Sequence, residues 1–326
     1  MTVIDIHNHV YPPRYVEAVQ AGPSAYKVTF DDDDNPVLHS PGDYNILVPG
    51  HRLMDVRKAV LEKAGVDKQI ISFTAPGTLI ETPERSVELS RLVNESFADI
   101  QDEHGDHFIP LATLPLNDPA ASVVELEYAL SELGLKGATL FSNANGVALS
   151  DRRFWPLYEK ANKMNVAFFI HPTYPVGVEA MTDYMLMPPV GFVADTTLAA
   201  ASLVFSGAVE RFPNIHWVLG HLGGTVPYLA ERFDRGYEAY PECREHINKP
   251  PSEYLKDFYY DTVNFDVRAL QFAIDFAGTK QLIAGSDYPH QIGSLEKMIS
   301  SINQLEITAE EKAGILGENA IRLLGL

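Results

Sequence analysis

The chain has 326 residues, 46% of them hydrophobic, and a formal net charge of −19. This length suffices for one large barrel or two ordinary domains, and such a charge repels phosphate backbones, so we expect no nucleic-acid partner. No apolar run reaches the about 18 residues of a membrane span, and no signal-peptide pattern is seen, so we expect no membrane association. Cys243 is the only cysteine, which excludes an intramolecular disulfide and indicates a reducing, cytoplasmic setting.

The first strand is predicted at the start of the chain. Apolar residues alternate from Val3 and lead into His7-Asn8-His9. Residues i and i+2 of a strand point to the same side, so His7 and His9 should project together from its C-terminal end. Two neutral imidazoles that converge are half of a metal site. The alternative is two unrelated surface histidines at a frayed terminus.

A long connection is predicted over residues 13–50, which are rich in Gly, Pro and Asp. Its four adjacent aspartates, residues 31–34, are interpreted as a solvated turn, with a cation site as the alternative. Helical spacing follows over residues 52–65 and ends at Gly65, a helix stop signal.

Short apolar strands then alternate with helices to the end of the chain. The seven further strands are predicted at residues 68–74, 108–114, 137–141, 166–172, 216–221, 258–262 and 281–287. The helices after the first are predicted at residues 82–104, 118–133, 153–163, 196–211, 224–235, 266–277, 294–303 and 308–324. Pro76 and Gly77 are expected to halt the second strand.

Eight such units favour an α/β fold, a (β/α)8 barrel of one domain over residues 1–326. A doubly wound open sheet is the alternative, but no glycine-rich phosphate loop follows the first strand. In a barrel, catalytic residues lie at the C-terminal ends of the strands. The polar residues predicted there are His7, His9, His171, His221 and Asp287.

Histidines with a carboxylate are typical ligands of first-row divalent metals, and we expect zinc, with manganese as the alternative. A lysine at the C-terminal end of the fourth strand would indicate a carbamate that bridges two metals. Lys136 lies at the other end of that strand, so a single metal is favoured.

Four motifs resemble the amidohydrolase superfamily, and within it the branch related to aminocarboxymuconate-semialdehyde decarboxylase. They are His-x-His after strand 1, His-Pro after strand 5, Gly-His-Leu-Gly-Gly after strand 6 and Gly-Ser-Asp-Tyr-Pro after strand 8. The branch includes non-oxidative decarboxylases of hydroxybenzoates and some hydrolases. The resemblance implies these metal ligands: His7, His9, His171 and Asp287.

The resemblance also implies His221 as an acid/base group and Arg57 and Arg232 as binders of a substrate carboxylate. In related enzymes the residue at the Arg232 position reaches the neighbouring subunit's site, which implies a homodimer. From the sequence alone, Arg57 could instead be a solvated helix charge, and Arg232 could pair with an acidic neighbour such as Glu231.

Four further positions are interpreted as supporting groups. Asp5 is expected to be a structural hydrogen-bond partner, and Asp261 and His290 to orient the ligands. Asp195, with Thr196, is interpreted as the N-cap of the helix before strand 6. The loops at 22–50 and 173–195 follow strand ends and are expected to roof the site.

Two reactions use these parts. A decarboxylase would use Asp287 to protonate a substrate carbon, with His221 as the relay, and would take a small hydroxyaromatic or muconate-type carboxylic acid. A hydrolase of a lactone, ester or amide would use Asp287 to accept a proton from water and His221 to polarise the carbonyl. The branch resemblance favours decarboxylation. A barrel that only binds would be expected to have lost a ligand.

Overall fold

A computed structural model describes residues 2–40, 43–75 and 77–326. Its centre is a parallel sheet of short strands that pair in chain order. These strands are β1 (Ile4–Asp5), β5 (Lys68–Ile71), β6 (Phe108–Pro110), β7 (Ala112–Thr113), β8 (Ala138–Phe141), β11 (Ala167–His171), β12 (His216–Leu219), β13 (Tyr259–Asp261) and β14 (Leu282–Ile283).

Backbone hydrogen bonds close this sheet into a ring. The strands β6 and β7 continue one another through Leu111, whose N–H donates to Ile71 O at 2.9 Å. At the other seam, Ile6 N donates to Ala284 O at 2.9 Å, and Asn8 forms a parallel bridge with Tyr288. Counting β6 and β7 as one strand, the ring follows the eight predicted strands, so the barrel prediction is confirmed and the open sheet is wrong.

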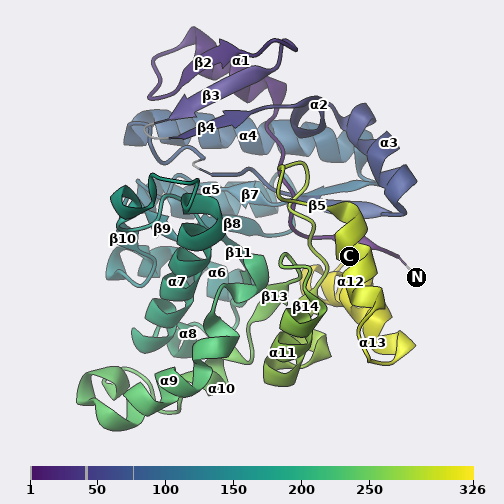
Figure 1. Ribbon diagram of the computed structural model, residues 1–326. Coiled ribbons are helices and arrows are strands. Elements are labelled where there is room, and N and C mark those ends of the chain that lie inside the picture. Colours follow the sequence, from purple (N-terminus) through teal and green to yellow (C-terminus); the bar gives the residue numbers. More distant parts are fainter. Residues whose placement is uncertain (1, 41–42, 76) are drawn as a thin grey trace.

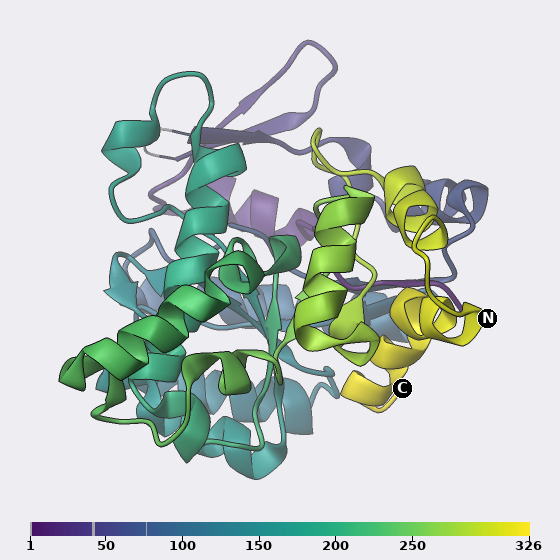
Figure 2. The ribbon, with the colours of Figure 1, turned by 60° about the horizontal axis from the view of Figure 1, so that its bottom comes forward.

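Helices form the outer layer around these strands (Figures 1 and 2). The longer helices are α3 (Met54–Ala64), α4 (Pro83–His104), α5 (Pro119–Ser131), α6 (Trp155–Met164), α7 (Val193–Phe205), α9 (Val226–Ala239), α11 (Val267–Ala277) and α12 (Leu295–Asn303). The shorter ones are α2 (Pro49–Arg52), α8 (Ala208–Arg211), α10 (Pro251–Leu255), α13 (Ala309–Ala313) and α14 (Asn319–Leu324). Side-chain caps set several helix starts: Thr82, for example, accepts from the Arg85 N–H at the start of α4.

The strands are apolar because both of their faces are covered. All five residues of β11 are buried, between the barrel interior and the helices. A parallel sheet of this kind is read in the sequence as a continuous apolar run. A polar residue at the end of such a run, such as His171, is therefore conspicuous.

The helix predicted over 196–211 differs from the observed one at both ends. It begins earlier, at Val193, and continues directly from a π-helical stretch, Met187–Phe192. It ends at Phe205, and the chain turns at Gly207, whose φ of 78° suits glycine, before α8 begins.

The prediction that Asp195 is an N-cap is therefore wrong. Asp195 lies inside the first turn of α7, where it is buried and accepts hydrogen bonds from Ser142 Oγ and from Asn143 Nδ2, the latter at 2.8 Å. By length and composition alone, residues 187–205 would also suffice to cross a membrane. The buried contacts of Asp195 with the residues that follow β8 instead make this segment part of the helical layer around the barrel.

The segment over 13–50 is more regular than the predicted connection. It contains α1 (Pro13–Ala21) and an antiparallel sheet of β2 (Lys27–Phe30), β3 (Pro36–Ser40) and β4 (Asp43–Ile46). This sheet lies at the top of the molecule in Figure 1.

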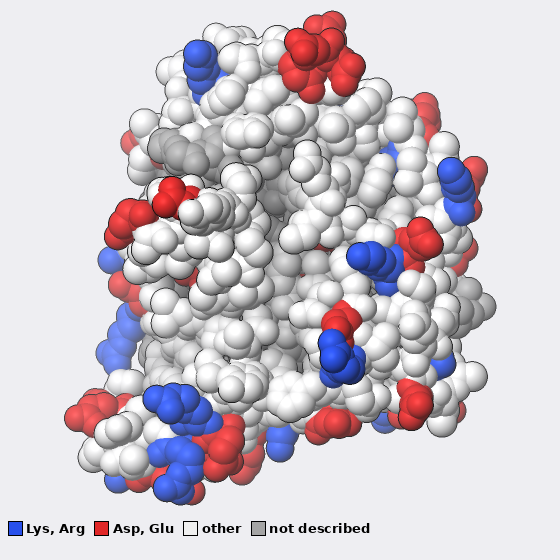
Figure 3. Space-filling model, in the orientation of Figure 1, with Lys and Arg blue, Asp and Glu red and all other residues white. Residues whose placement is uncertain are grey.

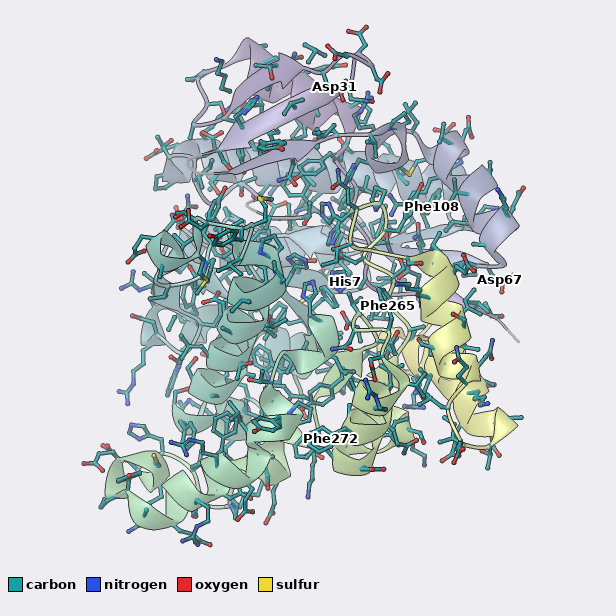
Figure 4. All side chains as sticks on the ribbon, in the orientation of Figure 1. His7, Asp31, Asp67, Phe108, Phe265 and Phe272 are labelled. Atoms are coloured by element: carbon teal, nitrogen blue, oxygen red, sulfur yellow. The ribbon has the colours of Figure 1, made fainter. Side chains whose placement is uncertain are left out.

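The aspartate turn joins β2 to β3, and its acidic side chains gather at one extremity of the molecule (Figures 3 and 4). Asp31 organises the turn by accepting from the N–H groups of Asp33 and Asn35. The turn prediction is confirmed. Pro76, one of the two residues predicted to end the strand β5, lies outside the described residues.

The two long loops meet beside the mouth of the barrel. The hydroxyls of Ser40, at the end of β3, and Tyr174, after β11, are hydrogen-bonded to each other. A small hairpin of β9 (Asn143–Ala144) and β10 (Val147–Ala148) follows β8 at the same end. A cavity of about 200 Å³ lies between this hairpin and the segment after β11, with Asn143, Thr173 and Tyr174 in its wall.

Candidate metal centre

The predicted ligands converge where the strands end. His7 and His9 follow β1, His171 is the last residue of β11, and Asp287 follows β14. One ligand atom from each of the four lies within 4.8 Å of the others, and all four side chains are buried. Figure 4 labels His7 in the interior of the molecule, far from the aspartate turn.

The histidine tautomers suit a metal. His7 Nδ1 is hydrogen-bonded to the carboxylate of Asp261, which directs Nε2 towards the cluster. His171 Nδ1 lies 2.7 Å from Pro172 O, which leaves its Nε2 as the lone-pair nitrogen. A carboxylate or carbonyl behind the imidazole is the usual support of a metal-binding histidine. Asp261 therefore orients the imidazole of His7, the predicted ligand.

The residues present fit a divalent metal. His7 Nε2 is buried and has no hydrogen-bond partner among the described residues, although Asp287 Oδ1 lies 3.5 Å away. His9 Nε2 lies 2.9 Å from the same oxygen. Three imidazole nitrogens and one carboxylate are a donor set typical of zinc and similar ions.

The pKa shifts keep two of the three imidazoles available to a metal. Burial, aided by the neighbouring imidazoles, holds the pKa of His9 and of His171 well below its usual range. Burial also lowers the pKa of His7, but Asp261 and Asp287 outweigh that effect and raise it above the usual value. Burial raises the pKa of Asp261, but the charge of His7 outweighs it, and the net shift is downward. His9 and His171 are therefore neutral, the form that binds metals.

His221 lies beside this cluster on the loop after β12. Its Nε2 is 3.9 Å from Asp287 Oδ2, and its ring centroid is 4.8 Å from that of His7. Burial, together with the charge of His7, lowers its pKa to about 4 although Asp287 and Asp261 act in the opposite direction. The structure thus brings the predicted acid/base residue to the predicted ligands.

The His221 loop has a strained backbone, and hydrogen bonds to Asp261 hold it in place. His221, Leu222 and Asp287 have φ values of 53°, 56° and 60°, in the left-handed region that costs non-glycine residues about 1–3 kcal/mol each. The N–H groups of His221 and Leu222 donate to Asp261 at 3.0 and 2.8 Å. One carboxylate therefore fixes both His7 and the loop of His221.

The next two residues, Gly223 and Gly224, explain why the motif ends in glycine. A Cβ at Gly223 would lie 2.5 Å from the Tyr260 ring, and a Cβ at Gly224 would lie 2.2 Å from Val193 O. Both also have positive φ values. Only glycine lets the chain pass this close to β13 and α7.

Asp5 braces the two segments that carry ligands. It accepts from the His7 N–H at 3.2 Å and from both the N–H and the hydroxyl of Ser286, at 3.0 and 2.6 Å. Burial raises its pKa to about 6, although Ser286 and Gln69 act in the opposite direction. The predicted structural role of Asp5 is confirmed.

The prediction that Arg57 binds a substrate carboxylate is corrected by its surroundings. Its side chain is fully buried, and it donates to His9 O, Gly50 O, Asn8 Oδ1 and Gln69 Oε1 at 2.6–2.8 Å. Its guanidinium also stacks 4.9 Å from the Tyr288 ring centroid. Arg57 therefore positions the end of β1 and is not a solvated helix charge either.

Arg232 lies on the exposed side of α9. The structure does not bring it to the cluster of ligands through any contact within the chain's described residues. Its predicted contact with a substrate therefore requires a second subunit.

Two histidines extend the cluster beyond the predicted ligands. The ring of His290 lies 4.6 Å from that of His9, and the ring of His51, on α2, lies 5.2 Å from that of His290. His290 was expected near the site from its place after the Asp287 motif. His51 was not, because it lies between the connection predicted over 13–50 and the helix predicted over 52–65, where no short helix was expected.

The family of the chain follows from comparison with known proteins. An amidohydrolase family model matches residues 4–326. The chain is 35% identical over 277 residues to a 2-amino-3-carboxymuconate-6-semialdehyde decarboxylase of Dictyostelium discoideum, covering 83% of this chain and 76% of that relative.

Solved structures share the fold. A 5-carboxyvanillate decarboxylase from Sphingomonas paucimobilis superposes with a TM-score of 0.87 at 24% identity, covering 100% of this chain and 99% of that one. A dihydroxybenzoic acid decarboxylase from a Polaromonas species, with bound manganese and an inhibitor, superposes with a TM-score of 0.84 at 22% identity, covering 100% and 97%. With its family motifs at the strand ends of a matching barrel, this chain belongs to the amidohydrolase family.

Proposed function

We propose that the protein is a metal-dependent, non-oxidative decarboxylase of a small hydroxyaromatic or muconate-type carboxylic acid. The observation that carries the proposal is the position of Asp287, which lies among the ligand imidazoles and 3.9 Å from His221 Nε2. The relative at 35% identity, a decarboxylase, supports the same reaction.

The residues around Asp287 suit a planar acid. The ring of Phe192 lies 6.4 Å from that of His171 and 6.5 Å from that of His221, and it is only partly buried. An aromatic wall beside the cluster offers a face on which a flat substrate stacks. A divalent metal held by His7, His9, His171 and Asp287 would fix the substrate oxygens and withdraw electron density from the bond to be broken.

The chain supplies the proton. In decarboxylation the bond between the ring carbon and the carboxyl carbon breaks, CO2 leaves, and the electron pair stays on the ring carbon, which takes a proton. Asp287 Oδ2 delivers that proton, and His221 Nε2 restores it from solvent, which this partly exposed imidazole reaches. Asp287 itself is buried, which limits the access of bulk water to the reacting carbon.

The test is CO2 release by metal-loaded protein over a panel of ortho-hydroxybenzoates and carboxymuconate semialdehydes. We expect release from at least one acid, and its loss in His221→Ala with the fold and metal content unchanged. Lactones and esters are followed in parallel with a pH indicator. Acid production from these without CO2 would overturn the proposal and assign the hydrolase reaction to the same residues.

We propose zinc as the metal, because three of the four donors are imidazoles, which zinc binds well, whereas harder ions prefer oxygen ligands. Manganese is the alternative, since it is bound in the Polaromonas decarboxylase structure. Elemental analysis of the purified protein, followed by reconstitution of chelator-treated protein with either ion, decides between them. Higher turnover with manganese at equal occupancy would contradict the zinc assignment.

We propose that the protein is a cytoplasmic homodimer in which Arg232 binds the carboxylate of a substrate held by the other subunit. Its exposed position on α9 supports this, and guanidinium pairs well with carboxylates. Asp287→Asn and Arg232→Ala protein, each inactive alone, are mixed after reversible dissociation. Recovered activity is expected, because mixed dimers contain one complete site. No recovery from verified mixed dimers would contradict the shared site.

A further inference from the structure

A row of imidazoles runs past the metal ligands into a part of the site that the proposed reaction leaves unused. In contact order it is His221, His7, His9, His290 and His51, with neighbouring ring centroids 4.6–5.2 Å apart. His221 and His290 are the members that reach solvent, and they flank the two ligands of β1. Both rings are therefore open to a substrate that approaches Asp287 from solvent.

At the end of the row, buried imidazole nitrogens receive no hydrogen bond from the described residues. His51 is 2% exposed, and neither of its ring nitrogens has a hydrogen-bond partner in the parts of the chain that the structure describes. His9 Nδ1 is likewise buried without a hydrogen-bond partner among the described residues. Buried polar atoms are usually paired, and leaving one unpaired costs about 1–3 kcal/mol. A phenylalanine would fill the same space without that penalty, so imidazoles here indicate a ligand that forms hydrogen bonds.

The scaffold holds these rings rigidly. The Arg57 guanidinium donates to Gly50 O on α2 and to His9 O, so one side chain sets α2 against the end of β1. His51 O accepts from the Tyr11 N–H at 2.9 Å, and the His51 ring packs against the Tyr11 ring.

The other side of α2 is equally constrained. A Cβ at Gly50 would lie 2.5 Å from Tyr288 Oη, so α2 packs directly on the loop that carries Asp287 and His290. A pair of rings fixed in this way is preorganised, and a preorganised group binds and discriminates better than a mobile one.

We propose that His290, supported by His51, forms a specificity subsite for a second hydroxyl group on the substrate ring. This inference rests on the proposed decarboxylase function and names the substrate class within it: ortho-hydroxy acids with a further hydroxyl on the side facing α2. A neutral imidazole offers one donor and one acceptor, and a hydroxyl both donates and accepts. A carboxylate only accepts, so it matches this pair less well.

The test uses wild-type protein and four variants, His290→Phe, His290→Asn, His51→Phe and His51→Gln, compared at equal metal occupancy. His246→Phe, at an exposed site on another face, is the matched control. Each protein is assayed with 2-hydroxybenzoate and with dihydroxybenzoates that carry one further hydroxyl. Rates of CO2 release give kcat and KM, and titration calorimetry gives Kd without turnover.

We expect the phenylalanine variants to lose about tenfold of the wild-type preference for the favoured dihydroxybenzoate over 2-hydroxybenzoate, which corresponds to one lost hydrogen bond. The loss should appear in KM and Kd, and Asn or Gln should recover part of it. An equal loss for both acids, or none, overturns the subsite. If no acid releases CO2, the proposed function fails, but the calorimetric comparison still decides the subsite. The subsite is also overturned if the wild-type protein binds dihydroxybenzoates no better than 2-hydroxybenzoate, or binds neither.

Discussion

Two buried polar clusters meet at the end of β1, and they are built in opposite ways. The first cluster is hydrogen-bonded throughout: Arg57 donates to Asn8 and Gln69, Gln69 donates to Asp5, and Ser286 donates to Asp5. The second cluster is the row of imidazoles. Several of its ring nitrogens are buried with no hydrogen-bond partner within residues 2–40, 43–75 and 77–326: His7 Nε2, His9 Nδ1, His221 Nδ1 and both nitrogens of His51.

The difference separates scaffold from function. A fully paired polar network rigidifies the chain and fixes the segments it joins. A cluster of unpaired polar atoms is unfavourable for folding alone, so it is expected where a ligand completes it. The paired cluster around Asp5 therefore positions the strand ends, and we expect the unpaired imidazoles to be completed by the proposed metal and substrate. Substitutions in the two clusters should differ in kind.

The largest effect is expected from Asp287→Asn. The side chain keeps its shape but cannot deliver a proton and is a poorer ligand, so turnover should fall by at least about 1,000-fold. Initial rates of CO2 release measure this, with circular dichroism and metal analysis as controls. Substantial residual turnover would show that Asp287 does not carry the proton.

Arg57→Met should affect the fold first. The variant removes the donor to His9 O, Gly50 O and Asn8, and leaves these acceptors buried, so the free energy of unfolding should fall by about 3–5 kcal/mol. Urea unfolding followed by circular dichroism measures the change. Arg235→Met, at an exposed ion pair, is the matched control and should change stability by less than about 0.5 kcal/mol. A small effect of Arg57→Met would remove the distinction between the clusters.

Asp261→Asn should weaken metal binding while retaining the fold. The carboxylate supports His7 and the His221 loop, and loss of such a partner typically lowers metal affinity about 10–100-fold. Competition with a chromogenic chelator measures the affinity. Asp266→Asn, which keeps a helix cap at the start of α11, should leave it unchanged. Unaltered affinity in Asp261→Asn would mean that His7 needs no support.

The sequence predicted the barrel well because the signals were local. Buried parallel strands are continuous apolar runs, and His171 or Asp287 at the end of such a run stands out. The sheet of β2, β3 and β4 was missed because its pattern is neither continuous nor clearly alternating. The start of α7 was misplaced because Asp195 has the residue type of an N-cap, whereas its actual partners, Ser142 and Asn143, are about 50 residues away in the chain.

Residue types predicted which groups gather at the site, but their roles depended on long-range contacts. Arg57 has the spacing of a helix charge, and only its four distant acceptors show that it is internal. His51 gave no signal at all. Its importance comes from its place beside His290, which is distant in the sequence.

The smallest effect on stability, and the sharpest test of the comparison, is expected from His51→Phe set against Gln69→Leu. Both side chains are buried near Arg57. Arg57 donates to Gln69 on β5 and to the carbonyl of Gly50, the neighbour of His51 on α2. Gln69 accepts from Arg57 and donates to Asp5, so Gln69→Leu should lower the free energy of unfolding by about 2–4 kcal/mol. His51→Phe loses no hydrogen bond within the described chain, so it should change that free energy by less than about 1 kcal/mol, or raise it. Equal losses in urea unfolding would mean that His51 is as much a part of the scaffold as Gln69, and the functional reading of the unpaired imidazoles would fail.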